Sequence, residues 1–303
     1  MLTRRHFLAA AGAAAALPLA PRRLWAGASL ALGSLRLDTL SDGTLTLPGD
    51  FILGGMPQAE MQAIVAKYNL PTDVLTPPCN VTLLRDGTNT VLFDVGAGPD
   101  FQASAGKLWQ ALELLGLAPE DITHVLFTHA HPDHLWGLLD EFDEPLFPNA
   151  EYAIGAAEFD YWMNPDTVTS IGAARTAFAV GAQRRLSVIA DTVRRVADGD
   201  EVLPGVQAVL TPGHSPGHLA WAIGAGSETA MVVGDALGNH HVAFERPDWP
   251  SGSDQDKDMA AATRVALLDR LAADRMALIG YHLPGGGIGH AERTGTTYRF
   301  VES

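Results

Sequence analysis

The chain has a single cysteine, Cys79, among 303 residues, so it can form neither an intramolecular disulfide nor a CxxC metal or redox pair. Basic residues are also scarce: 20 Lys and Arg stand against 35 Asp and Glu, which gives a formal charge of −15. A polyanion would be repelled, so nucleic acid is not an expected partner. Hydrophobic residues make up 47% of the chain, which is enough for a globular protein with a sizeable core.

No apolar run is long enough for a membrane span of roughly 20 residues. The N-terminal run, residues 9–19, is mostly alanine and is broken by Pro18; it follows TRRHFL at residues 3–8 and precedes the small residues Ala-Gly-Ala at 26–28. This layout is typical of a twin-arginine signal peptide. We therefore predict a leader over residues 1–28, export to the periplasm, no stable membrane anchor and a mature charge of −19.

The rest of the chain mixes strand and helix patterns. Alternating apolar residues at 34–40 and 44–47, separated by Asp42-Gly43, predict a hairpin, and segments 80–84 and 90–95 predict a second one. A long helical pattern covers residues 256–273. Because no linker or repeat divides residues 29–303, we expect one α/β domain there.

Histidines and one aspartate are concentrated in the sequence HAHPDH, where four metal-ligand residue types occur within six positions: His129, His131, Asp133 and His134. At the end of an extended strand, residues two apart point to the same side, so His129 and His131 can hold one cation. Asp133 and His134 follow Pro132, where a turn into a helix would redirect them to a second ion. One tetrahedral ion could not take all four and stay open. Imidazole and carboxylate ligands suit zinc, with Mn, Fe or Co as alternatives.

Three further ligand candidates each follow a strand-like apolar run: His214 in TPGHSPGH, Asp235 in MVVGD and His282 in LIGYH. A glycine directly precedes His214 and Asp235, which leaves room for the backbone to approach the site. A carboxylate shared by two ions would give a two-metal site with the ions roughly 3.5–4 Å apart.

These segments, together with SDGTLTLPGD, LFDVGAG, FPNAEY and the C-terminal IGYHLPGGGIGH and YRFV, resemble the metallo-β-lactamase-fold hydrolases over residues 35–301. Within that superfamily the sequence is most similar to methyl parathion hydrolase and its lactonase and arylesterase relatives. The resemblance implies a four-layer αββα sandwich with the metals at one edge of two back-to-back sheets.

The resemblance also implies individual roles. His129, His131 and His214 would hold one metal, Asp133, His134 and His282 the other, and Asp235 would bridge the two. Residues expected to brace the site are Asp94, His124 and His218. No Ser or Cys nucleophile is required.

The expected reaction is the attack of a metal-bridging hydroxide on a neutral ester, lactone or phosphotriester of small size, with Asp133 orienting the hydroxide and shuttling a proton. Core packing is the default role for the aromatic residues close to the metal motifs, but they could instead form the wall of an apolar substrate pocket: Trp136, Phe159, Tyr161, Trp162, Phe244 and Trp249.

Two other functions are compatible with these motifs. A periplasmic metallo-β-lactamase would use a similar HxHxDH motif, but the Asp235 position resembles the lactonase and phosphotriesterase branches more. A metal-dependent binding protein without turnover is the non-enzymatic alternative. A homodimer is compatible with the sequence, which leaves the oligomeric state and the native substrate open.

Overall fold

The computed structural model describes residues 26–303. Most of the predicted leader lies outside this range, but its last three residues form the beginning of strand β1 (Ala26–Leu32). The Ala28 backbone N–H donates to Thr39 Oγ1 at 3.0 Å. The expected cleavage boundary after residue 28 therefore falls within a paired strand.

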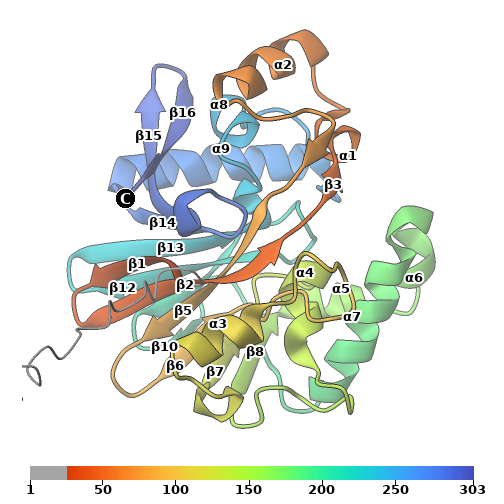
Figure 1. Ribbon diagram of the computed structural model, residues 1–303, viewed down its shortest axis with the longest axis vertical. Helices are drawn as coiled ribbons and strands as arrows, with labels where there is room; N and C mark the ends of the chain where they lie inside the picture. Colours follow the sequence, from red (N-terminus) through yellow and green to blue (C-terminus); the bar gives the residue numbers. More distant parts are fainter. Residues whose placement is uncertain (1–25) are drawn as a thin grey trace, which may run out of the picture.

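Two seven-stranded sheets form the centre of the fold (Figure 1). The first has the order β1, β2 (Leu35–Thr44), β5 (Pro78–Arg85), β6 (Thr90–Phe93), β7 (His124–Leu126), β8 (Glu151–Gly155) and β9 (Arg194–Val196). The second has the order β10 (Glu201–Leu203), β11 (Val206–Leu210), β12 (Leu219–Ala225), β13 (Glu228–Gly234), β14 (Ala277–Gly280), β15 (Ile288–Thr294) and β16 (Thr297–Glu302). A two-stranded ribbon joins β3 (Leu47–Pro48) to β4 (Val74–Leu75).

Successive side chains of the central strands are apolar on both faces, so both faces of each sheet must be covered. In β6, Phe93 belongs to the core shared with the second sheet, whereas Leu92 belongs to the core beneath the helices. In β13, Val232 faces the first sheet and Val233 faces α9. Because successive side chains point to opposite faces, strands buried on both sides are apolar throughout.

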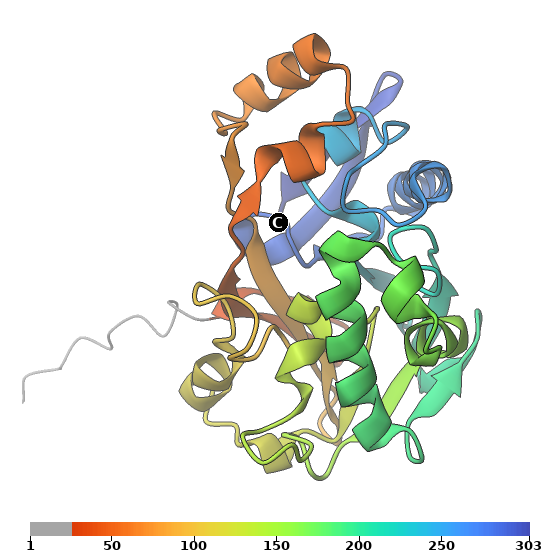
Figure 2. The ribbon, with the colours of Figure 1, turned by 90° about the vertical axis from the view of Figure 1, so that its right-hand side faces the viewer.

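Helices cover the outer faces of both sheets (Figures 1 and 2). The helices are α1 (Gly49–Leu53), α2 (Gln58–Lys67), α3 (Leu108–Leu114), α4 (Pro132–Leu135), α5 (Ala156–Met163), α6 (Thr167–Ser170), α7 (Thr176–Ile189), α8 (Val242–Glu245) and α9 (Lys257–Asp274). Helices α3, α5 and α7 pack on the first sheet and α9 on the second. This arrangement confirms the predicted four-layer αββα sandwich. Among residues 26–303, no helix combines the length and the apolar character that a bilayer crossing requires.

The predicted hairpin at 34–47 is wrong. Strand β2 continues through Asp42 and Gly43 and pairs with β1 and β5. Asp42 does not form a turn because its carboxylate is buried and accepts the backbone N–H groups of Ala97, Gly106 and Leu108. The second hairpin is confirmed as β5–β6. The helix predicted at 256–273 is confirmed as α9, with the Asp256 side chain capping its N-terminus.

Candidate metal centre

The carboxyl ends of neighbouring parallel strands bring the ligand candidates together. Strands β13 and β14 run parallel with Gly234 opposite Gly280, so Asp235 and His282 leave the second sheet side by side. Gly234 has φ 51°, and a Cβ there would lie 2.7 Å from His218 Nε2. Only glycine lets the strand end this close to the site.

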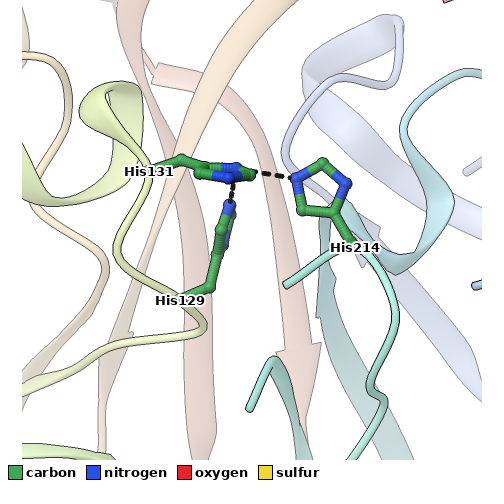
Figure 3. Close-up of side chains that lie close together, drawn as sticks. All are labelled: His129, His131 and His214. Carbon is green, nitrogen blue, oxygen red and sulfur yellow. Dashed lines mark hydrogen bonds between the residues drawn. The ribbon is translucent and has the colours of Figure 1, made fainter. Parts of the chain in front are cut away.

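Three histidines form one cluster at this edge (Figure 3). His129 Nε2 lies 3.0 Å from His131 Nδ1, which in turn lies 2.9 Å from His214 Nε2. Burial, reinforced by neighbouring imidazoles, lowers the pKa of His129 and His131 well below 6.5. The rings are therefore neutral, which is the form that binds a metal ion.

A mixed cluster of Asp133, His134, Asp235 and His282 lies beside it. His282 Nε2 is 3.2 Å from Asp133 Oδ2 and 3.3 Å from Asp235 Oδ2, and His134 Nε2 is 3.2 Å from Asp235 Oδ1. Asp235 Oδ2 is also 3.3 Å from His214 Nε2 of the three-histidine cluster. One carboxylate thus contacts both clusters.

The residues of the mixed cluster fit a cation. Three of its buried atoms have no hydrogen-bond partner: Asp133 Oδ2, His134 Nε2 and Asp235 Oδ1. Buried polar groups in proteins are nearly always paired, so unpaired atoms aimed at one point indicate a binding site. In both clusters the ligand atoms lie within 4.8 Å of one another, and nitrogen and carboxylate oxygen ligands suit zinc.

The charges of the mixed cluster lead to the same conclusion. Burial raises the pKa of the Asp133 and Asp235 carboxyls, but His134 and His282 outweigh it and bring both pKa values below 3.8. Burial lowers the pKa of His134 and His282, but the two carboxylates outweigh it and raise both well above 6.5. The ionised carboxylates therefore favour a positive charge at this position, which protons or a divalent cation can supply.

Asp94 hydrogen bonds to both ends of the segment 128–134, which carries ligands of both clusters. Its Oδ2 accepts from His134 Nδ1 at 2.8 Å, and its two oxygens accept the Thr128 backbone N–H at 2.7 Å and the Thr128 hydroxyl at 2.8 Å. Thr128 Oγ1 is also 3.0 Å from His129 Nδ1. Asp94 therefore orients His134 directly and His129 through Thr128.

The remaining ligand histidines also have partners on the ring nitrogen that faces away from the cluster. His214 Nδ1 lies 3.1 Å from Asp254 Oδ1, and Arg264 Nη1 donates to the other Asp254 oxygen at 2.7 Å. His131 Nε2 lies 3.2 Å from the Gln255 amide. His282 Nδ1 donates to the Pro78 carbonyl at 2.8 Å. Such partners set the tautomer of each ligand.

His218 and Glu158 support the ligand loops. His218 Nε2 accepts the Asp235 backbone N–H at 3.0 Å, and burial lowers its pKa to about 3, so the ring is neutral. Glu158 accepts the Ala130 N–H at 3.0 Å and the Ser215 hydroxyl at 2.7 Å. Glu158 thereby joins the loop of His129 and His131 to the loop of His214.

His124 is placed differently from the expectation that it braces the site. It begins β7, at the end of the strand opposite to the ligands, and its side chain contacts Thr123 Oγ1 at 2.9 Å and Glu151 at 3.9 Å. Because parallel strands present their carboxyl ends to the site, a residue at an amino end lies away from it. The bracing role is corrected for His124.

Of the aromatic candidates, only Trp249 lines the cavity described below, and the others pack in or against the cores. Trp162 is fully buried and donates from Nε1 to Glu158 at 2.6 Å. Phe159 lies in the core with the Arg195 guanidinium 4.1 Å from its ring centre, and Trp136 packs against Phe101 at 5.6 Å. For these three side chains the structure therefore shows the default role, core packing.

A cavity of about 310 Å³ opens onto the metal centre from the side of α1 and α8. Ligands from both clusters line it: His131, Asp133, His214, Asp235 and His282. The rest of its wall is largely apolar and includes Phe51, Ile52, Met56, Phe101, Phe178 and Trp249. This volume lies at the lower end of small-molecule pockets.

Comparison with known proteins agrees with this architecture. The family model described as the Metallo-beta-lactamase superfamily matches residues 75–279. The chain belongs to this superfamily. A superfamily relative from Xenopus laevis, Metallo-beta-lactamase domain-containing protein 1, is 33% identical over 201 residues, which cover 65% of this chain and 68% of the relative.

Two solved superfamily structures are similar over nearly the whole chain. AidC, described as a dizinc quorum-quenching lactonase in complex with a product, is 26% identical with a TM-score of 0.85, covering 91% of this chain and 97% of AidC. The hydrolase AbOPH is 25% identical with a TM-score of 0.84, covering 91% of this chain and 96% of AbOPH. Lactonases are therefore among the chain's structural neighbours.

Sequence reasoning missed the residues that orient the ligands, above all Asp254, Glu158 and Gln255. Glu158 is a fully buried carboxylate inside an apolar helical pattern, and this was the one signal that could have identified it. Asp254 and Gln255 lie in a polar loop before α9 that has no distinguishing pattern.

Proposed function

We propose that the protein is a dinuclear zinc hydrolase that cleaves small, neutral lactones and esters. The observation that carries this proposal is the position of Asp235: its carboxylate contacts both ligand clusters and also lines an apolar cavity. Two adjacent cations at this position would face any molecule bound in the cavity.

Divalent ions held by the two clusters would supply Lewis acidity and would lower the pKa of a bound water to about 7. The protein itself supplies the remaining functions. Asp133 lines the cavity as an ionised carboxylate, so it can orient a water molecule close to the reacting bond and relay its proton. The aromatic wall excludes water and binds the apolar part of the substrate.

Lactones are the favoured substrates because the cavity wall is apolar and because AidC, a lactonase, is similar over nearly the whole chain. Aryl esters and phosphotriesters share the neutral charge and belong to the proposal through the sequence resemblance to methyl parathion hydrolase. A β-lactam carries a carboxylate, which the acidic protein disfavours.

The experiment is a comparison of initial rates for the zinc-loaded protein on four substrates: an N-acyl homoserine lactone, an aryl ester, an aryl phosphotriester and a chromogenic cephalosporin. We expect the lactone or the neutral esters to be hydrolysed fastest and a chelator to abolish turnover. Dominant cephalosporin hydrolysis would make the protein a β-lactamase. Zinc binding without turnover of any substrate would make it a binding protein.

We also propose that the chain is exported to the periplasm, on the basis of the N-terminal sequence described above. The test replaces Arg4 and Arg5 with lysine and measures the distribution of the protein between periplasm and cytoplasm. The wild type should be periplasmic and the variant cytoplasmic. An identical distribution of the two would contradict twin-arginine export.

A further inference from the structure

Buried polar atoms without a partner identify one more group in the cavity. Among the described residues, six such side-chain atoms occur: three in the mixed cluster, one each in Arg85 and Trp136, and Nδ1 of His241. Arg85 and Trp136 do not line the cavity, whereas His241 does. Apart from the metal ligands, His241 is therefore the one residue of this set that a bound molecule can reach.

His241 is only 4% exposed, and its Nδ1 has no hydrogen-bond partner among the described residues. A buried imidazole nitrogen without a partner costs free energy. The sequence tolerates this cost at a position that faces the cavity. A substrate group that pairs with the ring would recover it.

The His241 ring is held in place by the surrounding helices. It lies at the N-terminus of α8, and its centre is 6.0 Å from the Tyr68 ring centre at the end of α2. The Tyr68 hydroxyl donates to Glu245 at 3.1 Å, which ties α2 to α8. Both views show α2 next to α8 at the same end of the molecule (Figures 1 and 2). The His241 ring therefore packs at the junction of α2 and α8.

The ring is neutral at physiological pH, because burial, together with the charge of His240, lowers the pKa of His241 to about 3. A neutral imidazole has one N–H donor and one acceptor nitrogen. It can therefore pair with a neutral polar group and has no charge with which to attract an anion.

We propose that His241 determines specificity by donating a hydrogen bond to a second carbonyl oxygen of the substrate while the scissile lactone or ester lies at the metal centre. The proposal rests on the proposed function and names its substrate class: neutral lactones or esters that carry an additional amide or ester carbonyl. A substrate with only a hydrocarbon chain would leave His241 unpaired.

The test compares two lactones of equal chain length, N-hexanoyl homoserine lactone and an α-alkyl-γ-butyrolactone that lacks the amide. His241→Phe keeps a planar ring and removes both nitrogens. For the amide lactone we expect kcat/KM to fall about tenfold to a hundredfold, mainly through KM, because a hydrogen bond of about 1–3 kcal/mol is lost in ground state and transition state alike. For the amide-free lactone, kcat/KM should stay within about twofold.

Two further variants separate a contact from a structural effect. His241→Gln restores a donor and should recover most of the preference for the amide. His290→Phe makes the same replacement at an exposed residue outside the cavity, where the ring contacts Ser303, and should change neither rate. Equal losses on both lactones in His241→Phe, or no loss on either, would overturn the proposal.

Binding measurements distinguish failure of this proposal from failure of the proposed function. If the wild type hydrolyses neither lactone, the proposed function fails, and titration calorimetry of the zinc-loaded protein then decides the role of His241. A Kd for the amide lactone that is about tenfold weaker in His241→Phe than in the wild type would support the contact. An equal Kd, or no binding by the wild type, would contradict it.

Discussion

The metal centre and the far wall of the cavity differ in whether their buried polar groups are paired by hydrogen bonds. At the metal centre, each ligand histidine has a partner on its outward nitrogen. Arg264 in turn donates to Asp254, the partner of His214. On the α8 side, the wall is largely apolar, and Nδ1 of its buried imidazole, His241, has no hydrogen-bond partner among the described residues. If His241 contacts the substrate as proposed, the rigid ligand set determines reactivity and the unpaired imidazole nitrogen determines substrate choice.

The largest effect is expected at the residue that joins the two clusters. Asp235→Ala removes the carboxylate shared between His214 and His282. We expect kcat to fall on the order of 10³-fold, because several kcal/mol of metal-dependent stabilisation are lost, and the zinc content to fall from two ions to one. Steady-state kinetics and metal analysis measure both, with the exposed Asp258→Ala as the control. Unchanged turnover would refute the bridged two-metal site.

Next in size are the partners of the ligands. Asp254→Asn weakens the support of His214, and Asp94→Asn that of His134. Each should reduce zinc affinity by about 10- to 100-fold, Asp254→Asn at the three-histidine cluster and Asp94→Asn first at the mixed cluster. Stepwise zinc titration against a competing chelator resolves the two sites. If Asp254→Asn weakened both sites equally, the clusters would not be separate units.

A smaller effect is expected on the wall. Phe51 lines the cavity and is 39% exposed, so Phe51→Ala should leave the fold intact. Losing part of an apolar contact of about 1 kcal/mol should raise KM roughly threefold to tenfold for a long-chain lactone. The kcat value should not change, because the ligands keep their positions. A fall in kcat at constant KM would show that wall and metal centre are coupled.

The unpaired wall histidine should also be visible in the pH dependence of stability. Burial lowers the pKa of His241 to about 3, so between pH 6.5 and about 3 the unfolded chain binds a proton that the folded chain does not. Stability is therefore lost as the pH falls through this window. His241→Phe should make the loss shallower by up to about 1.4 kcal/mol per pH unit. Denaturant unfolding at pH 4, 5 and 6 checks this, and parallel curves for the two proteins would contradict it.

The smallest effect is expected for His124→Phe. This side chain contacts Thr123 and Glu151 at the far end of β7. Turnover should stay within about twofold, and the free energy of unfolding should change by about 0.5 kcal/mol or less. A large loss of activity would restore the bracing role first expected for this residue.

The sequence allowed the seven ligand candidates to be listed because each has a local signal: four are concentrated in HAHPDH, and the other three each follow an apolar strand. The structure brings all seven together. The aromatic wall could not be predicted in the same way. Trp162 and Phe178 both lie near His131, with ring centres 5.7 and 5.9 Å from it, but only Phe178 lines the cavity. Which side of a ligand an aromatic ring occupies depends on helix packing, and a pattern within the chain does not contain that information.

Prediction of the fold succeeded for elements that are stabilised by their neighbours in sequence and failed where a distant contact decides the structure. Periodicity identified α9 and the β5–β6 hairpin, since each is stabilised by neighbours in sequence. It failed at Asp42-Gly43, where a pair typical of turns continues a strand. The reason is long-range: the Asp42 carboxylate accepts backbone N–H groups as distant as Leu108, and a Cβ on residue 43 would lie 2.1 Å from the Ser104 carbonyl oxygen.

The division of the ligands between the two sheets has a thermodynamic consequence. His129, His131, Asp133 and His134 follow β7 of the first sheet, whereas His214, Asp235 and His282 follow β11, β13 and β14 of the second. Neither half of the molecule has a complete site. Ion affinity is therefore also a measure of how well the two sheets dock, and any substitution that loosens their shared core around Trp221 and Phe93 also weakens metal retention.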